Sequence, residues 1–454
     1  MIDFISLNPY TGEKHGKYQS ISDENLTVEI ELSKKSYYDK WKRMNVGERA
    51  AFIAPVSKYI MENKVEFATL ITAEMGKPFK ESIAEIEKVC WLIDYHCDNA
   101  EYFLKSVPIE TENTEVYIEY SPLGGILGIM PWNFPFWQVF RFAIPTLLAG
   151  NTILLKHAPN VPRCSLKIEE IFHRFLPDKN IYKNIFIDNS QVEFLLSNNF
   201  IQGVSLTGSE RAGSSVASIA GKHLKKCVLE LGGNDAFVIF EDSDIEKALD
   251  QFVVSRFLNN GQVCIAAKRL VVENKILERV KDGLLTRLKK INFGDPFDEN
   301  TNLTCLARED LSANLKSQFD FLIQENSRLV FEGVSNDKCS GFPALIEVID
   351  KNSFDFDEEL FGPLALLFTF ENTNDLIQLV NGSKYGLSAS IWLNDIDKAK
   401  IISRDIETGF VSINKMVASD PRIPFGGIKK SGFGKEMAEL GIKEFTNAKS
   451  IVIC

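Results

Sequence analysis

One cysteine stands in a sequence context that suggests chemistry. Cys264 lies in FLNNGQVCIAAKR, residues 257–269, and no second cysteine occurs within thirty residues of it on either side. A thiolate is a strong nucleophile, whereas a lone thiol is more often a small apolar core residue. A disulfide or a zinc site needs partners at suitable spacing, and the sequence offers none here. The Gly-Gln pair before Cys264 does not suit a packed core strand, which favours the reactive thiol.

Two other polar residues directly follow apolar runs that are predicted strands. Asn133, in GIMPWNFPFWQ, lies between Pro131 and Pro135, which stiffen the loop and remove competing backbone donors. An amide held there could donate to a developing oxyanion, or it could only satisfy a local turn. Glu230, in VLELGGNDA, ends a predicted strand before a Gly-Gly pair. Its carboxylate could serve as a general base, cap the next helix or pair with a lysine.

A run of small residues opens a predicted helix in SLTGSERAGSSV. Gly208 and Ser209 stand at its N-terminus, and Gly213 lies within its first turns. Free N–H groups and the helix dipole at such an end bind phosphate. The G-x-G-x-x-G fingerprint of dinucleotide-binding proteins is absent, so an ordinary capped helix is an equal alternative.

The elements that would position these residues alternate between helices and short strands. Residues 22–106 have apolar residues at helical spacing, and residues 114–124 alternate like a strand. Further apolar runs predict strands at 125–131, 151–156, 184–188, 203–208, 226–231, 269–274, 344–349, 364–370, 388–393 and 444–454. Helices are predicted between many of them. This alternation indicates an α/β fold with parallel sheets covered on both faces, in which ligands bind at the carboxyl ends of the strands.

Composition excludes several classes of function. The 454 residues are 45% hydrophobic and 25% charged, as expected for a globular protein of several domains. The net charge of −11 argues against nucleic acid and against adsorption to an anionic membrane. The apolar stretch from Leu123 to Leu155 contains three prolines and Arg141, so no membrane span is expected. With no recognisable signal peptide, no zinc-like spacing and no CxxC pair, a cytoplasmic protein with free thiols is expected.

The order of these motifs along the chain is more specific than any one of them. PWNFP, LTGS, LELGG, GQVC, EELFGP, YGLSASIW and PFGGIKKSGFGKE follow one another and are followed by a terminal strand. In this order they resemble the aldehyde dehydrogenase superfamily over nearly the whole chain. LLKHAPNVP, ASDPR and GGIKKSGFG are most similar to the shorter bacterial succinate-semialdehyde dehydrogenases that use NAD or NADP.

The resemblance implies two interleaved parallel α/β domains and a small β arm for oligomerisation. The dinucleotide-binding domain is expected at 1–114 and 129–231, and the catalytic domain at 232–435. Residues 115–128 and 436–454 are expected to form the oligomerisation strands of a homodimer or homotetramer.

The resemblance also assigns chemical roles. Cys264 attacks the aldehyde to form a thiohemiacetal, Asn133 stabilises its oxyanion, and Glu230 activates the water that hydrolyses the thioester. Residues expected to bind the cofactor are Trp132, Lys156, Gly208, Ser209, Gly232, Glu359 and Phe361. NAD-specific relatives often carry a glutamate three residues after the lysine, where this chain has Pro159. We therefore expect NAD to work and NADP to be tolerated.

The substrate is expected to be succinate semialdehyde. Arg141 and Ser419 occupy positions that match residues binding the substrate carboxylate, which suits a planar arginine. A second family arginine is replaced by Leu258, for which Arg256 or Arg422 could compensate. A structural ion pair remains an alternative role for Arg141, and an ordinary loop hydroxyl for Ser419. Glutarate semialdehyde, aliphatic aldehydes or a non-catalytic dinucleotide-binding role are the alternatives for the chain.

Two positions differ from many relatives. Ala266 replaces a second cysteine two residues after the nucleophile, which removes a local disulfide switch. Phe142 replaces a lysine nine residues after the oxyanion asparagine, so Glu436 is expected to help tune Glu230 through water.

Overall fold

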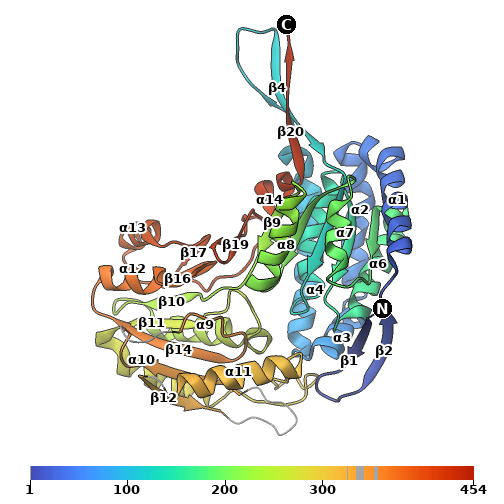
Figure 1. The fold of residues 1–454 in the computed structure, drawn as a ribbon. Helices are drawn as coiled ribbons and strands as arrows, with labels where there is room; N and C mark the ends of the chain where they lie inside the picture. Colours follow the sequence, from blue (N-terminus) through green and yellow to red (C-terminus); the bar gives the residue numbers. More distant parts are fainter. Residues whose placement is uncertain (1, 325, 334–341, 352–355) are drawn as a thin grey trace.

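The computed structural model describes residues 2–324, 326–333, 342–351 and 356–454. These residues form two lobes, each with its own central sheet, and an arm that projects away from both (Figure 1). The predicted α/β class with parallel sheets is confirmed.

Most of the first hundred residues are helical, as the spacing of their apolar residues predicted. The hairpin of β1 (Asp3–Leu7) and β2 (Lys14–Gln19) precedes α1 (Asp23–Asp39), α2 (Val46–Glu62), α3 (Lys64–Met75) and α4 (Phe79–Phe103). The long helix α4 packs against α2, α3 and α5. Its side chains therefore reach the loop that leads into α5.

The first lobe is built on a sheet of six strands within the described residues. Its parallel strands are β5 (Gly125–Met130), β6 (Thr152–His157), β7 (Tyr182–Asn184), β8 (Ile201–Thr207) and β9 (Lys226–Glu230). They pair in the order β9-β8-β5-β6-β7, and β19 (Gly432–Phe433) adds an antiparallel edge to β9. The strand order reverses between β5 and β8, and such a reversal marks the place where ligands bind in open α/β sheets.

Helices cover both faces of this sheet because its strands are apolar on both sides. The covering helices that follow the strands are α5 (Trp137–Leu148), α6 (Pro162–Phe175), α7 (Gln191–Ser197) and α8 (Glu210–Lys222). Ile126 of β5 lies in the core shared with α2 to α6, whereas its neighbour Leu127 lies in the core shared with α1, α7 and α8.

The second lobe has a sheet of seven described strands in the order β12-β13-β14-β11-β10-β16-β17. The strands are β10 (Ala236–Ile239), β11 (Arg269–Glu273), β12 (Ser327–Glu332), β13 (Ala344–Val348), β14 (Leu364–Phe370), β16 (Ser388–Trp392) and β17 (Phe410–Ile413). All pairings are parallel except that of β12 with β13. A small ladder joins β15 (Tyr385–Gly386) to β18 (Ile428–Lys429).

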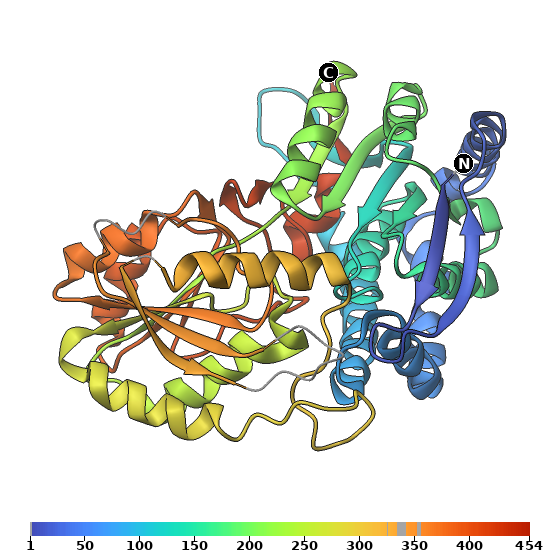
Figure 2. The ribbon, with the colours of Figure 1, turned by 60° about the horizontal axis from the view of Figure 1, so that its bottom comes forward.

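Helices again cover both faces of the second sheet. They are α9 (Ile245–Phe257), α10 (Leu277–Leu288), α11 (Glu309–Leu322), α12 (Thr373–Asn381) and α13 (Ile396–Asp405). Helices α9 and α10 share one core with the sheet, and α11, α12 and α13 share the other. Figure 2 shows α11 lying along one side of this lobe.

The arm consists of β3 (Val107–Pro108), β4 (Glu115–Pro122) and β20 (Thr446–Ile453), paired antiparallel in the order β20-β4-β3. Helix α14 (Ala438–Glu444) leads into β20, and the C-terminus lies at the tip of the arm (Figure 1). A terminal strand at 444–454 was predicted, and β20 confirms it.

Three details differ from the sequence-based expectations. Residues 125–128, expected in the arm, belong to β5, because they pair with β6 and β8 in the first sheet. Strand β7 begins two residues before the predicted run at 184–188. Cys305 is disulfide-bonded, so the expectation that every thiol is free was wrong, although Cys264 is a free thiol.

The division into domains at the predicted boundaries otherwise stays a prediction. Among the described helices, none has both the length and the apolar character needed to cross a membrane.

Candidate active site

The loop after β5 is held in place from two sides. The backbone N–H groups of Phe136 and Trp137 both donate to the Glu85 carboxylate of α4, at 2.8 and 2.9 Å. This caps the start of α5, where helical N–H groups lack intrahelical partners. The His157 Nε2 donates to the Pro135 carbonyl at 2.9 Å, and burial lowers the pKa of this histidine to about 4. Neutral His157 thus ties β6 to the loop that carries Asn133.

The loop that carries Cys264 is held by two buried cations. The Arg256 guanidinium donates to the carbonyls of Gly261, at 2.8 Å, and of Leu360 and Gly362. The Lys268 ammonium donates to the carbonyls of Val263, at 2.8 Å, and of Cys264 itself. These bonds lock the backbone on both sides of the cysteine.

Two asparagines shape the same loop. Asn259 and Asn260 have φ of 55° and 56°, a left-handed conformation that asparagine tolerates better than most residues. The Asn260 side chain bonds to the backbone of Thr304 and Cys305, which satisfies its amide. Asn259 instead donates through Nδ2 to the carbonyl of Asn133 at 2.8 Å. The loops after β5 and after α9 are therefore joined directly.

Asn133 and Cys264 line one cavity of about 370 Å³. The Asn133 Nδ2 donates to the Gln262 carbonyl at 3.0 Å, two residues before the nucleophile. A carboxamide nitrogen carries two N–H groups, so one remains for another acceptor. Burial raises the pKa of the Cys264 thiol to about 12, against the opposing charges of Lys268 and Arg141. The thiol is therefore protonated in this structure and needs a base before it can attack.

Glu230 ends β9 and is buried beside another carboxylate. Burial, and then the charge of Glu436, raises the pKa of Glu230, while Arg141 and Lys435 oppose the rise. Neither carboxylate oxygen of Glu230 has a hydrogen-bond partner within the described part of the chain. One of them lies beside Gly426, where an added Cβ would approach it to 2.8 Å. Glu230 does not line the cavity around Cys264, so its carboxylate is adjacent to the site without entering it.

Most residues expected to bind a cofactor surround the same 370 Å³ cavity. Its lining includes Trp132, Gly208, Ser209, Gly232, Glu359 and Phe361. Ser209 caps α8 through its hydroxyl, which accepts from the Ala212 N–H at 3.3 Å. Lys156 is the exception, because it does not line the cavity. It lies on β6, and burial lowers the pKa of its ammonium.

The donor and acceptor groups at this cavity fit a dinucleotide. It opens at the reversal between β5 and β8, where the start of α8 presents free N–H groups to a phosphate. An added Cβ at Gly208 would meet no atom closer than 3.6 Å, so space remains beside the backbone. Glu359 is held by Lys268 at 3.3 Å and accepts from the Gly233 N–H at 3.2 Å. The Glu359 carboxylate lies so close to Gly232 that a Cβ added at Gly232 would approach it to 2.5 Å.

A second cavity of about 230 Å³ also reaches Cys264. Arg141 and Ser419, the two residues expected to bind the substrate, both line it, together with Leu258 and Trp137. Cys264 thus lies where two cavities meet, one with the features of a dinucleotide site and one that is smaller and largely apolar.

Arg141 is not a free cation in this smaller cavity. Its Nε forms an ion pair with Glu436, and its guanidinium lies 5.0 Å from the centre of the Phe425 ring. Both Arg141 and Glu436 are almost fully buried. The alternative considered for Arg141, a structural ion pair, therefore applies alongside its place at the cavity.

Comparison with known proteins agrees with this arrangement. Residues 3–451 match the sequence profile of the Aldehyde dehydrogenase family. The chain belongs to the aldehyde dehydrogenase family. A probable NADP(+) succinate-semialdehyde dehydrogenase of Synechocystis sp. is 38% identical over 450 residues, which cover 99% of each chain. An NAD(P)+ succinate semialdehyde dehydrogenase of Escherichia coli is 37% identical over 449 residues, covering 98% of this chain and 97% of its own.

A solved structure gives the same picture of the fold. The crystal structure of succinic semialdehyde dehydrogenase from Streptococcus pyogenes, in complex with NADP+, matches this aldehyde dehydrogenase with a TM-score of 0.96. The two chains are 34% identical, and the match covers 99% of each.

The arginines that were candidates to replace the missing family arginine do not converge on Cys264. Arg256 is fully buried and donates to the carbonyl of Gly261 in the cysteine loop and to those of Leu360 and Gly362. Arg422 is exposed and forms two bonds with Asp420, at 2.9 and 2.7 Å. Neither guanidinium lines the smaller cavity of this aldehyde dehydrogenase.

Two residues at the cavities were missed by sequence reasoning. Gln138 lines both, and its buried Oε1 has no hydrogen-bond partner among the described residues. Lys88 of α4 lines the smaller one and donates to the Ser419 hydroxyl at 2.7 Å. A lysine on an amphipathic helix gives no sign of this in sequence, because the same spacing describes a solvated face.

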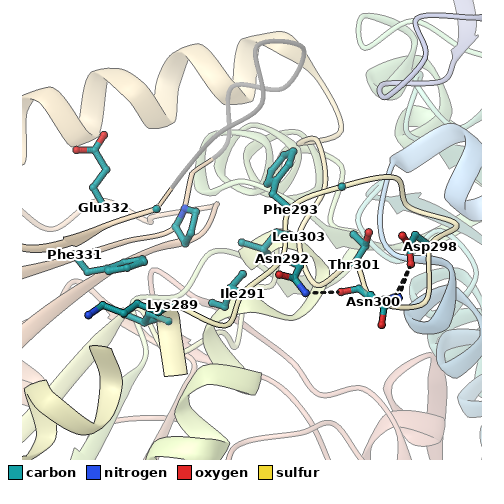
Figure 3. A pocket seen from close by; sticks show the side chains of 14 residues that line it. Lys289, Ile291, Asn292, Phe293, Asp298, Asn300, Thr301, Leu303, Phe331 and Glu332 are labelled. Carbon is teal, nitrogen blue, oxygen red and sulfur yellow. Dashed lines mark hydrogen bonds between the residues drawn. The ribbon is translucent and has the colours of Figure 1, made fainter. Parts of the chain in front are cut away.

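Another hollow lies elsewhere in the second lobe (Figure 3). Its volume is about 820 Å³, and it is bordered by the end of α10, by residues 291–303 and by β12. Asn292 spans part of it through a bond to the Asn300 carbonyl at 3.4 Å. None of the predicted site residues lines it, so size alone does not locate the chemistry in this aldehyde dehydrogenase.

Proposed function

We propose that this chain oxidises succinate semialdehyde to succinate, with NADP or NAD as the hydride acceptor. The observation that carries the proposal is the position of Cys264 where the dinucleotide-like cavity meets a small cavity containing cationic side chains. The named relatives, which share more than a third of their residues with this chain, support the same substrate.

In the proposed first step the Cys264 sulfur forms a bond to the aldehyde carbon. The thiol proton must leave, and Glu230, whose pKa is raised, is the base that accepts it through water. The free N–H of Asn133 and the backbone N–H of Cys264 donate to the oxyanion that develops. The resulting thiohemiacetal is tetrahedral and carries the hydrogen that must leave as hydride.

A nicotinamide dinucleotide supplies the hydride acceptor when it is bound. Loss of hydride leaves a thioester on Cys264. Glu230 first releases the thiol proton to solvent and then takes a proton from a water molecule, whose oxygen bonds to the thioester carbon. The carbon–sulfur bond breaks, the carboxylic acid leaves, and the sulfur regains a proton. Glu230 must turn away from Gly426 for this, since its carboxylate lies outside the cavity around Cys264.

The choice of cofactor follows from groups near β6. Pro159 provides no carboxylate that would repel a 2′-phosphate, and the Lys156 ammonium lies on the adjoining strand. The Streptococcus pyogenes structure contains NADP+, and the Synechocystis relative is named for NADP(+). We therefore propose that NADP serves at least as well as NAD, a shift from the expectation that NADP is only tolerated.

A second candidate function is oxidation of other short aldehydes. The side chains of Leu258, Trp137 and Phe425 make much of the smaller cavity apolar, which suits an uncharged aliphatic aldehyde. Glutarate semialdehyde is a further alternative substrate, because it is a short aldehyde that carries a carboxylate, as succinate semialdehyde does. A non-catalytic dinucleotide-binding role is disfavoured because Cys264 remains a free thiol between the two cavities.

One steady-state experiment separates these functions. We expect kcat/KM to be highest for succinate semialdehyde in a panel that includes glutarate semialdehyde, butanal and benzaldehyde, each measured with NAD and NADP. A preference for butanal would contradict the substrate proposal. Cofactor binding without turnover of any aldehyde would instead support the non-catalytic role. Cys264→Ala should abolish turnover and keep cofactor binding.

The arm supports a proposal about assembly. One edge of β20 is unpaired in the described sheet, and Val452 and Ile453 are 54% and 44% exposed there. An exposed strand edge with apolar side chains favours pairing with another chain. We propose a homodimer or homotetramer formed through the arm. A cytoplasmic location is part of the proposal, because Cys264 must stay reduced for the reaction.

A further inference from the structure

Lys88 is a cation at the smaller cavity that has no carboxylate ion-pair partner among the described residues. It stands on α4, and it lines the cavity together with Cys264. Its Nζ donates to the Ser419 hydroxyl at 2.7 Å and lies 4.4 Å from the centre of the Trp137 ring. It forms no ion pair with any residue that the structure describes. An ammonium has three N–H donors, so donors remain beyond the one used at Ser419.

The other cations near Cys264 are already neutralised or saturated. Arg141 is paired with Glu436, and Lys268 is paired with Glu359 and bonded to the carbonyl of Cys264. A substrate carboxylate at either of these would compete with a buried ion pair.

The two remaining arginines are committed outside the cavity, and Lys80, which also lines it, is exposed and donates through Nζ to the Glu299 carbonyl at 3.2 Å. Arg256 bonds to three backbone carbonyls, and Arg422 pairs with Asp420 at the surface. Removing a partner from a buried charge is costly, so the bonds of Arg141, Lys268 and Arg256 are not expected to open for a ligand. The exposed Arg422 does not line the cavity. Lys88 is thus the cation best able to receive an added anion.

The mostly apolar surroundings of Lys88 make its lack of an ion-pair partner energetically important. The Trp137 ring covers one side of the ammonium, and Met416, Val417 and Phe425 line the same small space. The carboxylates of Glu81 and Glu85 also line it, but they already accept from backbone N–H groups of Asn259 and of Phe136 and Trp137. An unpaired charge in such surroundings is stabilised by an opposite charge much more than it would be in water. A ligand carboxylate can supply that charge together with an acceptor for the free N–H groups.

We propose that Lys88 is the residue that selects carboxylate-bearing aldehydes, by forming a charge-assisted hydrogen bond to the substrate carboxylate beside Ser419. This inference rests on the proposed function and names the recognition element within it. Arg141 contributes to the local positive field but stays bound to Glu436. The cavity of about 230 Å³ holds both Lys88 and Cys264, so the aldehyde and the carboxylate must belong to one short molecule.

The test compares a charged and an uncharged aldehyde of equal chain length. Lys88→Met keeps a long side chain against Trp137 and removes the charge. We expect its kcat/KM for succinate semialdehyde to fall on the order of ten- to a hundredfold, mainly through KM, as for loss of a hydrogen bond to a charged group. For butanal we expect a change of less than about threefold, because no charge is recognised. Lys88→Arg should keep a large part of the preference.

The matched control is Lys58→Met, which removes an exposed cation of α2 that does not line the cavity. It should leave the preference unchanged. A second readout avoids turnover: succinate should slow alkylation of Cys264 by iodoacetamide in the wild type and fail to do so in Lys88→Met.

The outcomes separate this inference from the proposed function. If the wild type prefers succinate semialdehyde and Lys88→Met keeps that preference, the role of Lys88 is refuted and the proposed function stands. If Lys88→Met slows both aldehydes equally, Lys88 is structural and the inference is again refuted. If the wild type shows no preference for the charged aldehyde, the proposed function and the inference fail together.

Discussion

Replacement of Arg256 tests whether the reactive loop depends on a buried cation. The sequence left Arg256 as a possible partner for the substrate, whereas the structure places it against the carbonyls of Gly261, Leu360 and Gly362. Arg256→Met fills much of the same space and leaves these three carbonyls without the donor. The prediction concerns local stability of the Cys264 loop, and its effect on catalysis follows from that.

The size of the effect follows from the number of bonds lost. A buried carbonyl left without a partner costs about 1–3 kcal/mol. Release of the buried guanidinium from its unfavourable surroundings, which lower its pKa to about 9, offsets part of this cost. The Gly362 carbonyl keeps the Leu364 N–H as a donor at 2.8 Å, so we take about 1.5 kcal/mol for each of the other two carbonyls and expect a loss of about 3 kcal/mol. This corresponds to a roughly hundredfold increase in opening of the loop.

Hydrogen exchange of the backbone amides of residues 261–267 under native conditions reports that opening directly. We expect it to be about a hundredfold faster in Arg256→Met, with reduced kcat for charged and uncharged aldehydes alike. Arg422→Met is the control, because its guanidinium is exposed and paired with Asp420. Equal exchange rates in wild type and Arg256→Met would refute the reasoning. A rise in KM confined to succinate semialdehyde would show that Arg256 binds substrate instead.

Three further predictions concern the groups around Cys264. Burial raises the pKa of Glu230, and a base acts only when it is deprotonated, so as the pH is lowered turnover of butanal should be lost at a pH above the usual glutamate pKa of about 4.3. Glu230→Gln should slow the burst of NADPH, because the thiol loses its base, and should lower steady turnover as well, because the thioester then also lacks its base. Gly426→Ala would bring a Cβ within 2.8 Å of the Glu230 carboxylate and within 2.5 Å of the Gly434 carbonyl, so the backbone beside Glu230 must shift and kcat should fall about tenfold. Burial and the neighbouring Arg141 lower the pKa of Lys88 to about 8, while Asp420 and Glu85 oppose this shift. Because Lys88 loses its charge above a pH of about 8, the KM for succinate semialdehyde should rise there while the KM for butanal stays level. A parallel rise of both KM values would contradict the assignment.

Local sequence was sufficient for the residues that stand next to strand ends. Asn133 and Ser209 follow β5 and β8, and Cys264 precedes β11, and each lies on the cavity where the motif order placed it. The strands themselves were predictable because fully buried parallel strands are apolar on both faces. Boundaries were less predictable: β7 begins earlier than its apolar run, because its pairing with β6 determines which residues form the strand.

Charges were the part that local sequence could not assign. Glu230 was predicted from its strand end, but only the structure shows its carboxylate turned toward Gly426 and away from the cavity. Lys156 was also predicted to bind the cofactor. Only the structure shows that Lys156 does not line the cavity that the other predicted cofactor residues surround.

The sequence by itself determined the α/β class and the family and singled out Cys264 as the candidate nucleophile, because these depend on apolar periodicity and on short motifs whose members are neighbours in the chain. The tertiary structure decided which cation remains available to a substrate. Arg141 meets Glu436, and Lys88 meets Ser419 across 331 positions of sequence. Whether a charge is neutralised depends on which oxygen atoms lie within a few ångströms of it, and folding brings those atoms together from distant segments.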